Sequence, residues 1–581
     1  MIWYLIDPAR LMAERSAIEA LAANVDWLTE LQWSIDHQTR LVLRFTISLG
    51  DRRYQLVMTY PEFFPATPPG VRPLDAEHRI SPHQYGVGGD LCLEYRPDNW
   101  EPRFTGRDLI ESAHRLISIE QPVAGEPRQV RSAHFVTQGQ ELRAKRGRLL
   151  VTADLRDFMR MQPESTPFRC EVRTFFQHSG MSAVVNKVTL PDGATWKSLD
   201  IPKIGSLYRG ILVRVSTTDL QGLVEEGTGA RARQLRNALA EVVSPPLTAY
   251  EDREFIIATD GADIRLFWQL AASSDDIIQF ATLDIDDDKP RLPAGYEMLA
   301  GKRVTVVGCG SVGSKMATSL ARSGARYFLL VDDDVFIRKN LVRNDLDWRN
   351  MGEHKAEGLA ARIRRISPAT VAKVKCFRLG GQEAAGSASS LLSEIGGSDL
   401  IIDATADSRV FNLLSAVATG SKKPMVWCEV FAGGIGGFVP RYRPGIDHPP
   451  QTMRAILRSW FRDQGVPWSG GAAIDYGGED STGAPLVADD GDVSVVAAHA
   501  TRMAVDLLLG GVGFPHSMYV VSLKEGWIFE QPFEAYPVQG TQPPVAEPVS
   551  AASEQDWAEA AQFISHLIRA KADEAPSAPQ N

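Results

Sequence analysis

The spacing of hydrophobic and polar residues divides the chain into three blocks and a tail. In the first block, residues 1–125, "ARLMAERSAIEALAA" has helical periodicity, while "LVLRFTISL" and "RRYQLVMTY" alternate like antiparallel strands joined by a turn at Gly50–Asp51. A second helix is predicted in "TGRDLIESAHRLISIEQP", capped by Thr105 and stopped by Pro122. This order of helix, strands, turn-rich stretch and helix predicts an α+β domain.

The second block, residues 126–290, mixes short strands with one helix. Strands are predicted in "FRCEVRTFF", "GILVRVST" and "IRLFWQLA", and the helix in "GARARQLRNALAEVV". No motif in this block indicates a chemistry, so we expect an α+β linker domain of unknown role. A basic run in this block is typical of a solvated face or a linker, with a binding patch as the alternative. Its members are Arg143, Lys145, Arg146 and Arg148.

The third block, residues 291–540, alternates strands with helices, which predicts a mostly parallel sheet with covering helices. The tail, residues 541–581, opens with a linker composition and ends in a polar stretch that we expect to be disordered. Between them lies an amphipathic helix, which could dock on a partner or pack on its own chain. Its apolar positions are Trp557, Phe563, Ile564, Leu567 and Ile568.

Charge and cysteine content narrow the classes of protein. The net charge is -10, which argues against a general nucleic-acid or membrane-surface binder. Five cysteines without a Cys-x-x-Cys pair fit a reducing compartment, so we expect a cytoplasmic protein without a structural zinc site. No basic leader with an apolar core and no long apolar run occurs, so neither a signal peptide nor a transmembrane helix is expected.

The segment "KRVTVVGCGSVGSKMATSLARSGARYFLLVDDDV" carries the strongest chemical signal. A strand over 304–307 leads into Gly308-x-Gly310-x-x-Gly313, a helix follows, and a second strand ends at Asp332. Glycines let the backbone approach a phosphate at a helix N-terminus, and an acid after the next strand can bond a ribose hydroxyl. The order of these features predicts a nucleotide site.

The residues that follow this loop favour a nucleoside triphosphate over a dinucleotide cofactor. A dinucleotide-dependent dehydrogenase would match the loop, but Asn340, Arg343 and Lys355 add a polar and two cationic side chains past the ribose acid. A nucleoside triphosphate needs such groups, because charge on the departing pyrophosphate must be neutralised. Asp403 and Asp407 follow a further strand, and Asp407 could hold Mg²⁺ against the phosphates.

These residues resemble the signature of the MoeB/ThiF/ubiquitin-activating family. The matching positions are Gly308, Gly310, Gly313, Asp332, Asp334, Asn340, Leu341, Arg343 and Lys355. The resemblance implies a Rossmann-like domain that binds ATP and Mg²⁺ and adenylates the C-terminal glycine of a small protein, commonly as a homodimer. By the same resemblance, Asp332 contacts ribose, Arg343 and Lys355 contact the phosphates, and Asp407 binds the metal.

The first block holds a second motif around Cys92. "YPEFFPATPP" precedes the cysteine, a glycine-rich turn leads into it, and Trp100-x-Pro follows. This pattern resembles the catalytic core of ubiquitin-conjugating enzymes, which implies that Cys92 carries an acyl group as a thioester. Gln84 stands where that family has an oxyanion-stabilising asparagine, so Gln84 and the adjacent His83 are candidate catalytic residues. The alternatives are a small buried hydrophobe for Cys92 and a surface residue for His83.

The activating half lacks an expected cysteine. The loop Trp468–Ala500, where thioester-forming activating enzymes carry one, has none. The adenylate could therefore pass straight to Cys92. The remaining possibilities are another cysteine, Cys428 or Cys309, or a substituted loop position, Ser481 or Ala484.

The two motifs together resemble the bacterial fused ubiquitin-transferase-like proteins of type II CBASS anti-phage operons. That resemblance implies a CD-NTase-like cyclase or another glycine-terminated protein as substrate, a separate target protein, a homodimer formed through the adenylation domain, and neither a membrane nor a specific nucleic acid as partner. The alternatives are a sulfur-carrier-type adenylyltransferase, an adaptor with an inactive conjugating-like domain, and a dehydrogenase.

Overall fold

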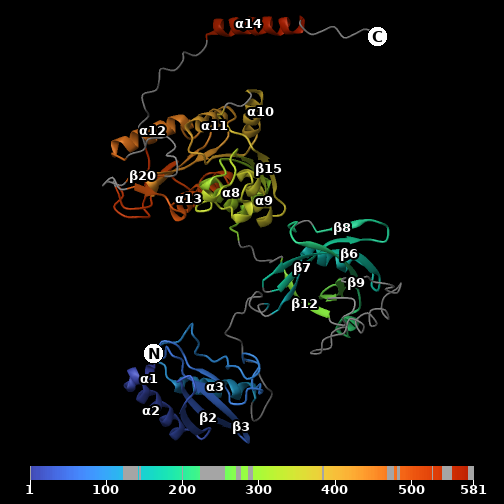
Figure 1. Ribbon diagram of the computed structural model, residues 1–581, viewed down its shortest axis with the longest axis vertical. Helices are drawn as coiled ribbons and strands as arrows, with labels where there is room; N and C mark the ends of the chain where they lie inside the picture. The colour runs from blue at the N-terminus through green and yellow to red at the C-terminus, as the bar shows by residue number, and fades with distance from the viewer. Residues whose placement is uncertain are drawn as a thin grey trace. The chain divides into compact units, whose positions relative to one another are not determined.

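The computed structural model shows a mixed α/β protein with several sheets (Figure 1). It describes residues 2–121, 142, 145–178, 180–198, 201–222, 255–269, 277–285, 292–381, 385–466, 477–479, 485–526, 528–539 and 553–573. By the density of internal contacts the chain divides into two compact units, Met1–Ala144 and Lys145–Asn581. Within the described ranges, no helix has the length and apolar character needed to cross a membrane.

The first unit is an antiparallel four-stranded sheet with helices before and after it. Its elements are α1 (Trp3–Ile6), α2 (Pro8–Asn24), β1 (Leu28–Ile35), β2 (Leu41–Leu49), β3 (Arg52–Thr59), β4 (Gly70–Pro73) and α3 (Gly106–Glu120). The strands follow one another in chain order, and the β2–β3 hairpin around Gly50 is confirmed. Helix α3 begins after Thr105 as predicted. Strand β1 was not predicted from the sequence. Pro122, the predicted stop of the helix, lies outside the described residues.

A buried carboxylate ties the helices of this unit to its proline-rich segment. Glu14 of α2 is fully buried and accepts hydrogen bonds from the Tyr60 hydroxyl at 2.9 Å and from the Gly106 N–H at 2.7 Å. Trp100 is also buried, and its indole N–H donates to the Pro65 carbonyl at 2.8 Å. The separated pieces of the motif around the cysteine are therefore packed together by side-chain contacts.

The second sheet is a closed barrel. Its elements are β5 (Gly147–Val151), α5 (Ala153–Arg160), β6 (Pro167–Gln177), β7 (Gly180–Thr189), β8 (Thr195–Lys197), β9 (Ser206–Arg214), α6 (Thr217–Gly222), β10 (Phe255–Thr259), β11 (Ile264–Gln269) and β12 (Ile277–Asp284). The order is β5-β12-β11-β10-β9-β6-β7-β8, and an additional β5–β7 pairing closes the ring.

The sequence reading captured only part of this barrel. The predicted strands β6, β9 and β11 are confirmed, while β5, β7, β10 and β12 were not predicted. The predicted helix over 229–243 lies outside the described residues. In the basic run, Lys145 and Arg146 are exposed, as a solvated face requires, and Arg143 is not among the described residues.

The third sheet has parallel strands at one side and antiparallel strands at the other. Its strands are β13 (Arg303–Val307), β14 (Tyr327–Val331), β15 (Val371–Lys375), β16 (Leu400–Asp403), β17 (Met425–Trp427), β18 (Glu429–Phe431), β19 (Gly436–Tyr442), β22 (Met518–Ser522) and β23 (Ala535–Pro537). The order is β15-β14-β13-β16-β17-β19-β22-β23, with β18 beside β19. The predicted parallel strands are confirmed from β15 to β17, but the antiparallel extension was not predicted.

Helices connect and cover these strands. The α-helices are α8 (Ser311–Arg322), α9 (Lys355–Ile366), α10 (Ala385–Gly396), α11 (Ser408–Gly420), α12 (Pro450–Asp463) and α13 (Asp490–Leu508). Short 3₁₀ helices span Tyr296–Gly301, Arg338–Asn340, Trp348–Asn350 and Ala432–Gly434, and a two-stranded ribbon pairs β20 (Gly477–Glu479) with β21 (Pro485–Val487). The predicted helix in the tail is confirmed as α14 (Glu554–Asp573), and its apolar side chains are exposed.

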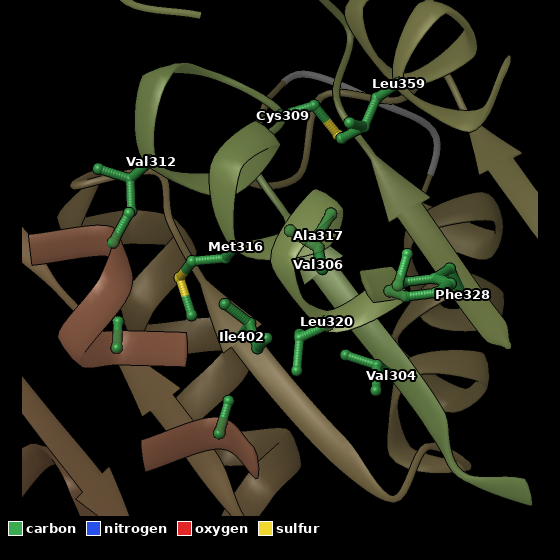
Figure 2. Packing of buried hydrophobic residues seen from close by; sticks show 14 of the residues in the cluster. Val304, Val306, Cys309, Val312, Met316, Ala317, Leu320, Phe328, Leu359 and Ile402 are labelled. Carbon is green, nitrogen blue, oxygen red and sulfur yellow. The ribbon is translucent and has the colours of Figure 1, made fainter. Parts of the chain in front are cut away.

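The hydrophobic core of the third sheet fixes the position of the glycine loop. Val304 and Val306 of β13 pack with Met316 and Leu320 of α8 and with Ile402 of β16 in one buried cluster (Figure 2). In the doubly wound strand order, the chain passes from β13 to β14 on one side and from β16 to β17 on the other, and open sheets with such a reversal have a crevice at the carboxyl ends of the strands. Ligands of open α/β sheets bind in such a crevice.

Candidate functional site

The glycine loop joins β13 to α8 at the carboxyl edge of the parallel strands. Gly308 has a φ of +88°, which favours glycine, and its N–H donates to the Val331 carbonyl at 2.9 Å. A Cβ on Gly313 would lie 1.8 Å from the Gly308 carbonyl oxygen. A Cβ on Gly310 would meet no heavy atom of the described residues within 4 Å. The three predicted glycines thus meet at the N-terminus of α8, where free N–H groups favour anions.

Asp332 directly follows β14, and its carboxylate reaches the glycine loop. One oxygen accepts the Cys309 N–H at 2.6 Å, and the other accepts the Asp334 N–H at 2.8 Å. Burial raises the pKa of Asp332, while these two donors and the Lys355 charge act in the opposite direction. Since a carboxylate offers about four lone-pair positions, Asp332 has capacity left for ribose hydroxyls.

Lys355, the first residue of α9, is held beside Asp334. Its ammonium lies 2.6 Å from an Asp334 carboxylate oxygen, and its backbone N–H donates to the Asp334 carbonyl at 2.9 Å. The ammonium carries three donor hydrogens, so this pairing leaves donors for phosphate oxygens. Asp334 therefore positions the lysine at the same edge as Asp332.

Asn340 and Arg343 lie between β14 and α9. The Asn340 side-chain oxygen accepts the Ile337 N–H at 3.0 Å and so braces the short helical turn at 338–340. Arg343 donates to the Ala488 carbonyl at 2.8 Å, just before α13. The structure thus ties both side chains to backbone groups, and their roles toward phosphates stay predictions.

Two aspartates mark the end of β16. Asp403 is buried, which raises its pKa to about 6, although the Thr405 hydroxyl and N–H donate to it at 2.7 and 3.0 Å. Asp407 caps α11, and the hydrogen-bonded Arg409 guanidinium at 2.7 Å holds the pKa of Asp407 below its ordinary value. Asp407 is therefore the more readily ionised of the two carboxyls.

These residues fit ATP with Mg²⁺. Mg²⁺ is usually held by one or two carboxylates together with phosphate oxygens and waters, and the role of Asp407 as its protein ligand stays a prediction. No cluster of three His, Cys, Asp or Glu side chains suited to a metal occurs in the described part of the chain.

In the first unit, a glycine-rich turn brings Cys92 opposite His83. The Cys92 N–H donates to the His83 carbonyl at 2.7 Å, and the Tyr85 N–H donates to the Asp90 carbonyl at 2.9 Å. The turn requires a glycine, because a Cβ on Gly89 would lie 1.9 Å from the Tyr85 carbonyl oxygen. Two short segments are thereby paired in antiparallel fashion.

Alternation along this pair places the side chains on two faces. Gln84 and Leu91 form the bridge between the segments, and both are only 5% exposed. Their neighbours His83, Tyr85 and Cys92 therefore project to the opposite face, and Tyr85 is 56% exposed.

The buried face determines what Gln84 does in this structure. Its side-chain oxygen accepts the Ile80 N–H at 3.0 Å, and its side-chain nitrogen donates to the His78 carbonyl at 3.1 Å. The amide thus braces its own loop, and its predicted oxyanion contact remains a prediction.

Cys92 opens onto a groove of about 640 Å³ that Tyr85 and Arg96 also line. Partial burial raises the pKa of the Cys92 thiol, and the nearby negative charge of Glu120 raises it further. A hydrogen bond from the Tyr85 hydroxyl and the positive charge of Arg96 lower it. The net effect of these groups, with burial the largest, raises the pKa of the Cys92 thiol above its ordinary value.

His83 is oriented by a carboxylate that the sequence analysis missed. Its ring Nδ1 lies 2.5 Å from one oxygen of Glu120, and the Ser81 hydroxyl donates to the other oxygen at 2.5 Å. Glu120 is buried at the end of α3, so only the folded domain brings it to His83. No local sequence signal indicates this pairing.

The remaining cysteines are poorer nucleophiles or lie elsewhere. Cys309 and Cys428 are buried, and burial raises the pKa of each thiol, which disfavours the thiolate in both. Cys376 is exposed and lies directly after β15. Ser481 and Ala484, the suspected substitution positions, lie outside the described residues. Cys92 is thus the partly exposed cysteine that lines a groove.

Comparison with known proteins defines the class of the C-terminal region. Residues 289–455 match the ThiF family, and they include the glycine loop, Asp332, Lys355 and Asp407. The C-terminal region of the chain therefore contains a ThiF-family domain, as predicted.

Among the curated relatives is the ATP-dependent ubiquitin transferase-like protein Cap2 of Pseudomonas aeruginosa, 27% identical over 169 residues, which are 28% of this chain and 26% of that protein. The SAMP-activating enzyme E1 of Haloferax volcanii is 33% identical over 141 residues, 24% of this chain and 49% of that protein. The matched stretches thus span between a quarter and a half of these relatives. A solved structure of E. coli MccB with AMPCPP and MccA aligns over 43% of this chain and 67% of its own, with 14% identity and a TM-score of 0.33.

Proposed function

We propose that this protein is an ATP-dependent ubiquitin-transferase-like enzyme. The glycine-loop site at the edge of its third sheet would adenylate the C-terminal glycine of a protein. Cys92 would then carry that protein as a thioester before its transfer to a target. The observation that carries the proposal is the presence of two distinct sites on one chain. One is the glycine loop with Asp332 and Lys355, and the other is Cys92 on the open face of its paired loop.

The chemistry begins at the glycine loop. A C-terminal carboxylate oxygen attacks the α-phosphorus of ATP, the new P–O bond forms, and pyrophosphate leaves. The N-terminus of α8, Arg343 and Lys355 neutralise charge on the phosphates, and Asp332 holds the ribose. Mg²⁺, held by Asp407, would supply additional neutralisation of the leaving pyrophosphate.

The activated acyl group then moves to the first unit. The Cys92 thiolate attacks the acyl carbonyl carbon, AMP leaves, and a thioester forms. An amine of the target next attacks the thioester, the C–S bond breaks, and an amide results. In this scheme His83, which Glu120 orients, accepts the proton that the amine loses.

The substrate and the setting belong to the same proposal. The names of the relatives support a protein substrate, and the resemblance to the fused CBASS proteins favours a CD-NTase-like cyclase and a role in anti-phage defence in the cytoplasm. Cys92 receives the acyl group directly in this scheme, because Cys428 and Cys309 are buried, whereas Cys92 is partly exposed and lines a groove. We further propose a homodimer formed through the adenylation domain.

A non-reducing gel with ATP, Mg²⁺ and a co-encoded cyclase tests the proposal. Wild type and Cys376→Ser, which removes an exposed cysteine elsewhere, should both give a thiol-sensitive band shifted by the mass of the cyclase. Cys92→Ala should give no such band but should keep ATP–pyrophosphate exchange, because the adenylation site is intact. A thiol-sensitive band that persists in Cys92→Ala would refute the role of Cys92. Equal product formation by wild type and Cys92→Ala would favour the adaptor or the sulfur-carrier alternative.

A further inference from the structure

The sulfur of Cys92 has a hydrogen-bond donor that its family resemblance does not assign. Tyr85 and Cys92 line the same groove, and the Tyr85 hydroxyl acts on the Cys92 thiol as a hydrogen-bond donor that lowers the pKa of the thiol. The pairing explains this contact, because alternation puts Tyr85 on the face of Cys92 and turns Gln84 to the core.

Tyr85 is a donor at physiological pH. Partial burial, the hydrogen bond to Cys92 and the charge of the sulfur raise the pKa of Tyr85 to about 12, so its O–H stays protonated. Since the hydroxyl is the proton donor in this pair, it stabilises the thiolate rather than the thiol. Arg96 lies near both groups and adds positive charge without replacing the hydroxyl contact.

We propose that Tyr85 is a catalytic residue that donates its hydroxyl hydrogen bond to Cys92 Sγ whenever that sulfur carries negative charge. The proposal rests on the thioester function proposed above. The role of Tyr85 concerns charge on the sulfur and is distinct from the oxyanion contact that the resemblance gives to Gln84.

Negative charge occurs on the sulfur before the first step and after the second. In the first, the thiolate electron pair forms the S–C bond, the C–O bond to AMP breaks, and charge leaves the sulfur. In the second, the amine nitrogen forms the C–N bond, the C–S bond breaks, and its electron pair returns to Sγ. The amine proton passes to His83 or to solvent, and the Tyr85 hydroxyl then bonds the released thiolate. The hydroxyl keeps its own proton throughout.

Two readouts test the proposal on the full chain. The first is the pH dependence of iodoacetamide alkylation, followed by mass at the Cys92 peptide because Cys376 is exposed as well. Tyr85→Phe should move the midpoint upward by at least about half a pH unit, since it removes a hydrogen bond to the charged form. The matched control is Tyr95→Phe, which deletes a hydroxyl from the same groove and should leave the midpoint unchanged. Thermal melting verifies that both variants are folded.

The second readout is discharge of the preformed thioester to a free amine at neutral pH. Tyr85→Phe should slow it by about tenfold or more, a modest part of what one preorganised donor can contribute, and Tyr95→Phe should not. An unchanged alkylation midpoint, or a changed midpoint with normal discharge, would overturn the proposal. If wild type forms no thioester, the proposed function has failed, and the alkylation midpoint alone still decides whether Tyr85 stabilises the thiolate.

Discussion

Alanine substitutions at two glycines of the same loop should affect different properties. Gly313→Ala should lower the stability of the fold, and Gly310→Ala should weaken the binding of ATP. A methyl group on Gly313 would lie 1.8 Å from the Gly308 carbonyl oxygen, whereas ordinary contact begins at 3.4 Å, so the helix and the loop must separate by about 1.6 Å. Overpacking of this kind costs roughly 1–3 kcal/mol. For a domain of about 200 residues, this corresponds to a fall in Tm of roughly 2–12 °C.

Gly310 offers the contrasting case. Its φ of -75° lies outside the left-handed region that favours glycine, and a Cβ there would meet no heavy atom in the described part of the chain within 4 Å. The loss of a glycine at the helix N-cap costs a few tenths to about 1 kcal/mol. Alanine also lowers the conformational entropy of the unfolded chain, which stabilises the folded state by about 0.4–1 kcal/mol. The stability of Gly310→Ala should therefore stay within about 0.5 kcal/mol of wild type.

Nucleotide binding should separate the two variants. If phosphates approach the N-terminus of α8 at Gly310, the methyl group of Gly310→Ala intrudes on them, and ATP affinity should fall at least about tenfold, or 1.4 kcal/mol. Thermal melting without nucleotide and calorimetric titration with ATP and Mg²⁺ measure the two effects. Gly310→Ala with wild-type affinity for ATP would refute the assignment of this loop to phosphate binding, and Gly313→Ala with an unchanged Tm would refute the packing argument.

For three further substitutions the structure predicts the direction in which a pH midpoint or the free energy of unfolding should change. Glu120→Gln removes a negative charge near Cys92, so the midpoint of the alkylation profile should move to lower pH, and an upward shift would contradict the electrostatic account. Trp100→Phe leaves the Pro65 carbonyl without its indole donor, and chemical denaturation should show a loss of about 1–3 kcal/mol. Asp403 has a folded pKa of about 6, above its unfolded value, so the folded state binds more protons between about pH 4 and pH 6 and stability falls as pH rises through that window. Asp403→Asn should lack this fall, which amounts to at most about 3 kcal/mol when unfolding is followed from pH 4 to pH 7.

Local sequence patterns predicted the geometry of the glycine loop, while its role in binding a nucleotide stays a prediction. Gly308, Gly313 and Asp332 meet because one strand, one loop, one helix and the next strand follow in order, so their contacts depend on a short stretch of chain. The hairpin around Gly50 and the cap at Thr105 were predictable for the same reason. The antiparallel extension of the third sheet was not, because it depends on the pairing of β19 with β22, two segments far apart in sequence.

The cysteine site shows where resemblance and geometry diverge. Counting back from Cys92 selects Gln84, but pairing across the turn buries Gln84 and turns Tyr85 toward the sulfur. Alternation could have indicated Tyr85 from the sequence, once the two segments were recognised as paired. Glu120 could not have been found in this way, because it reaches His83 only after α3 has packed against the sheet.

The turn at 86–89 has a consequence for how such sites diversify. Side chains alternate with a period of two, so a change in the length of this turn that slips the pairing by one residue would exchange the faces of Gln84 and Tyr85. The register of this pairing would then decide which of the two side chains faces the Cys92 sulfur. In relatives whose pairing is shifted by one residue, the residue at the position of Gln84 should face the sulfur in place of the residue at the position of Tyr85. This should hold even where both residues are a glutamine and a tyrosine, as they are here.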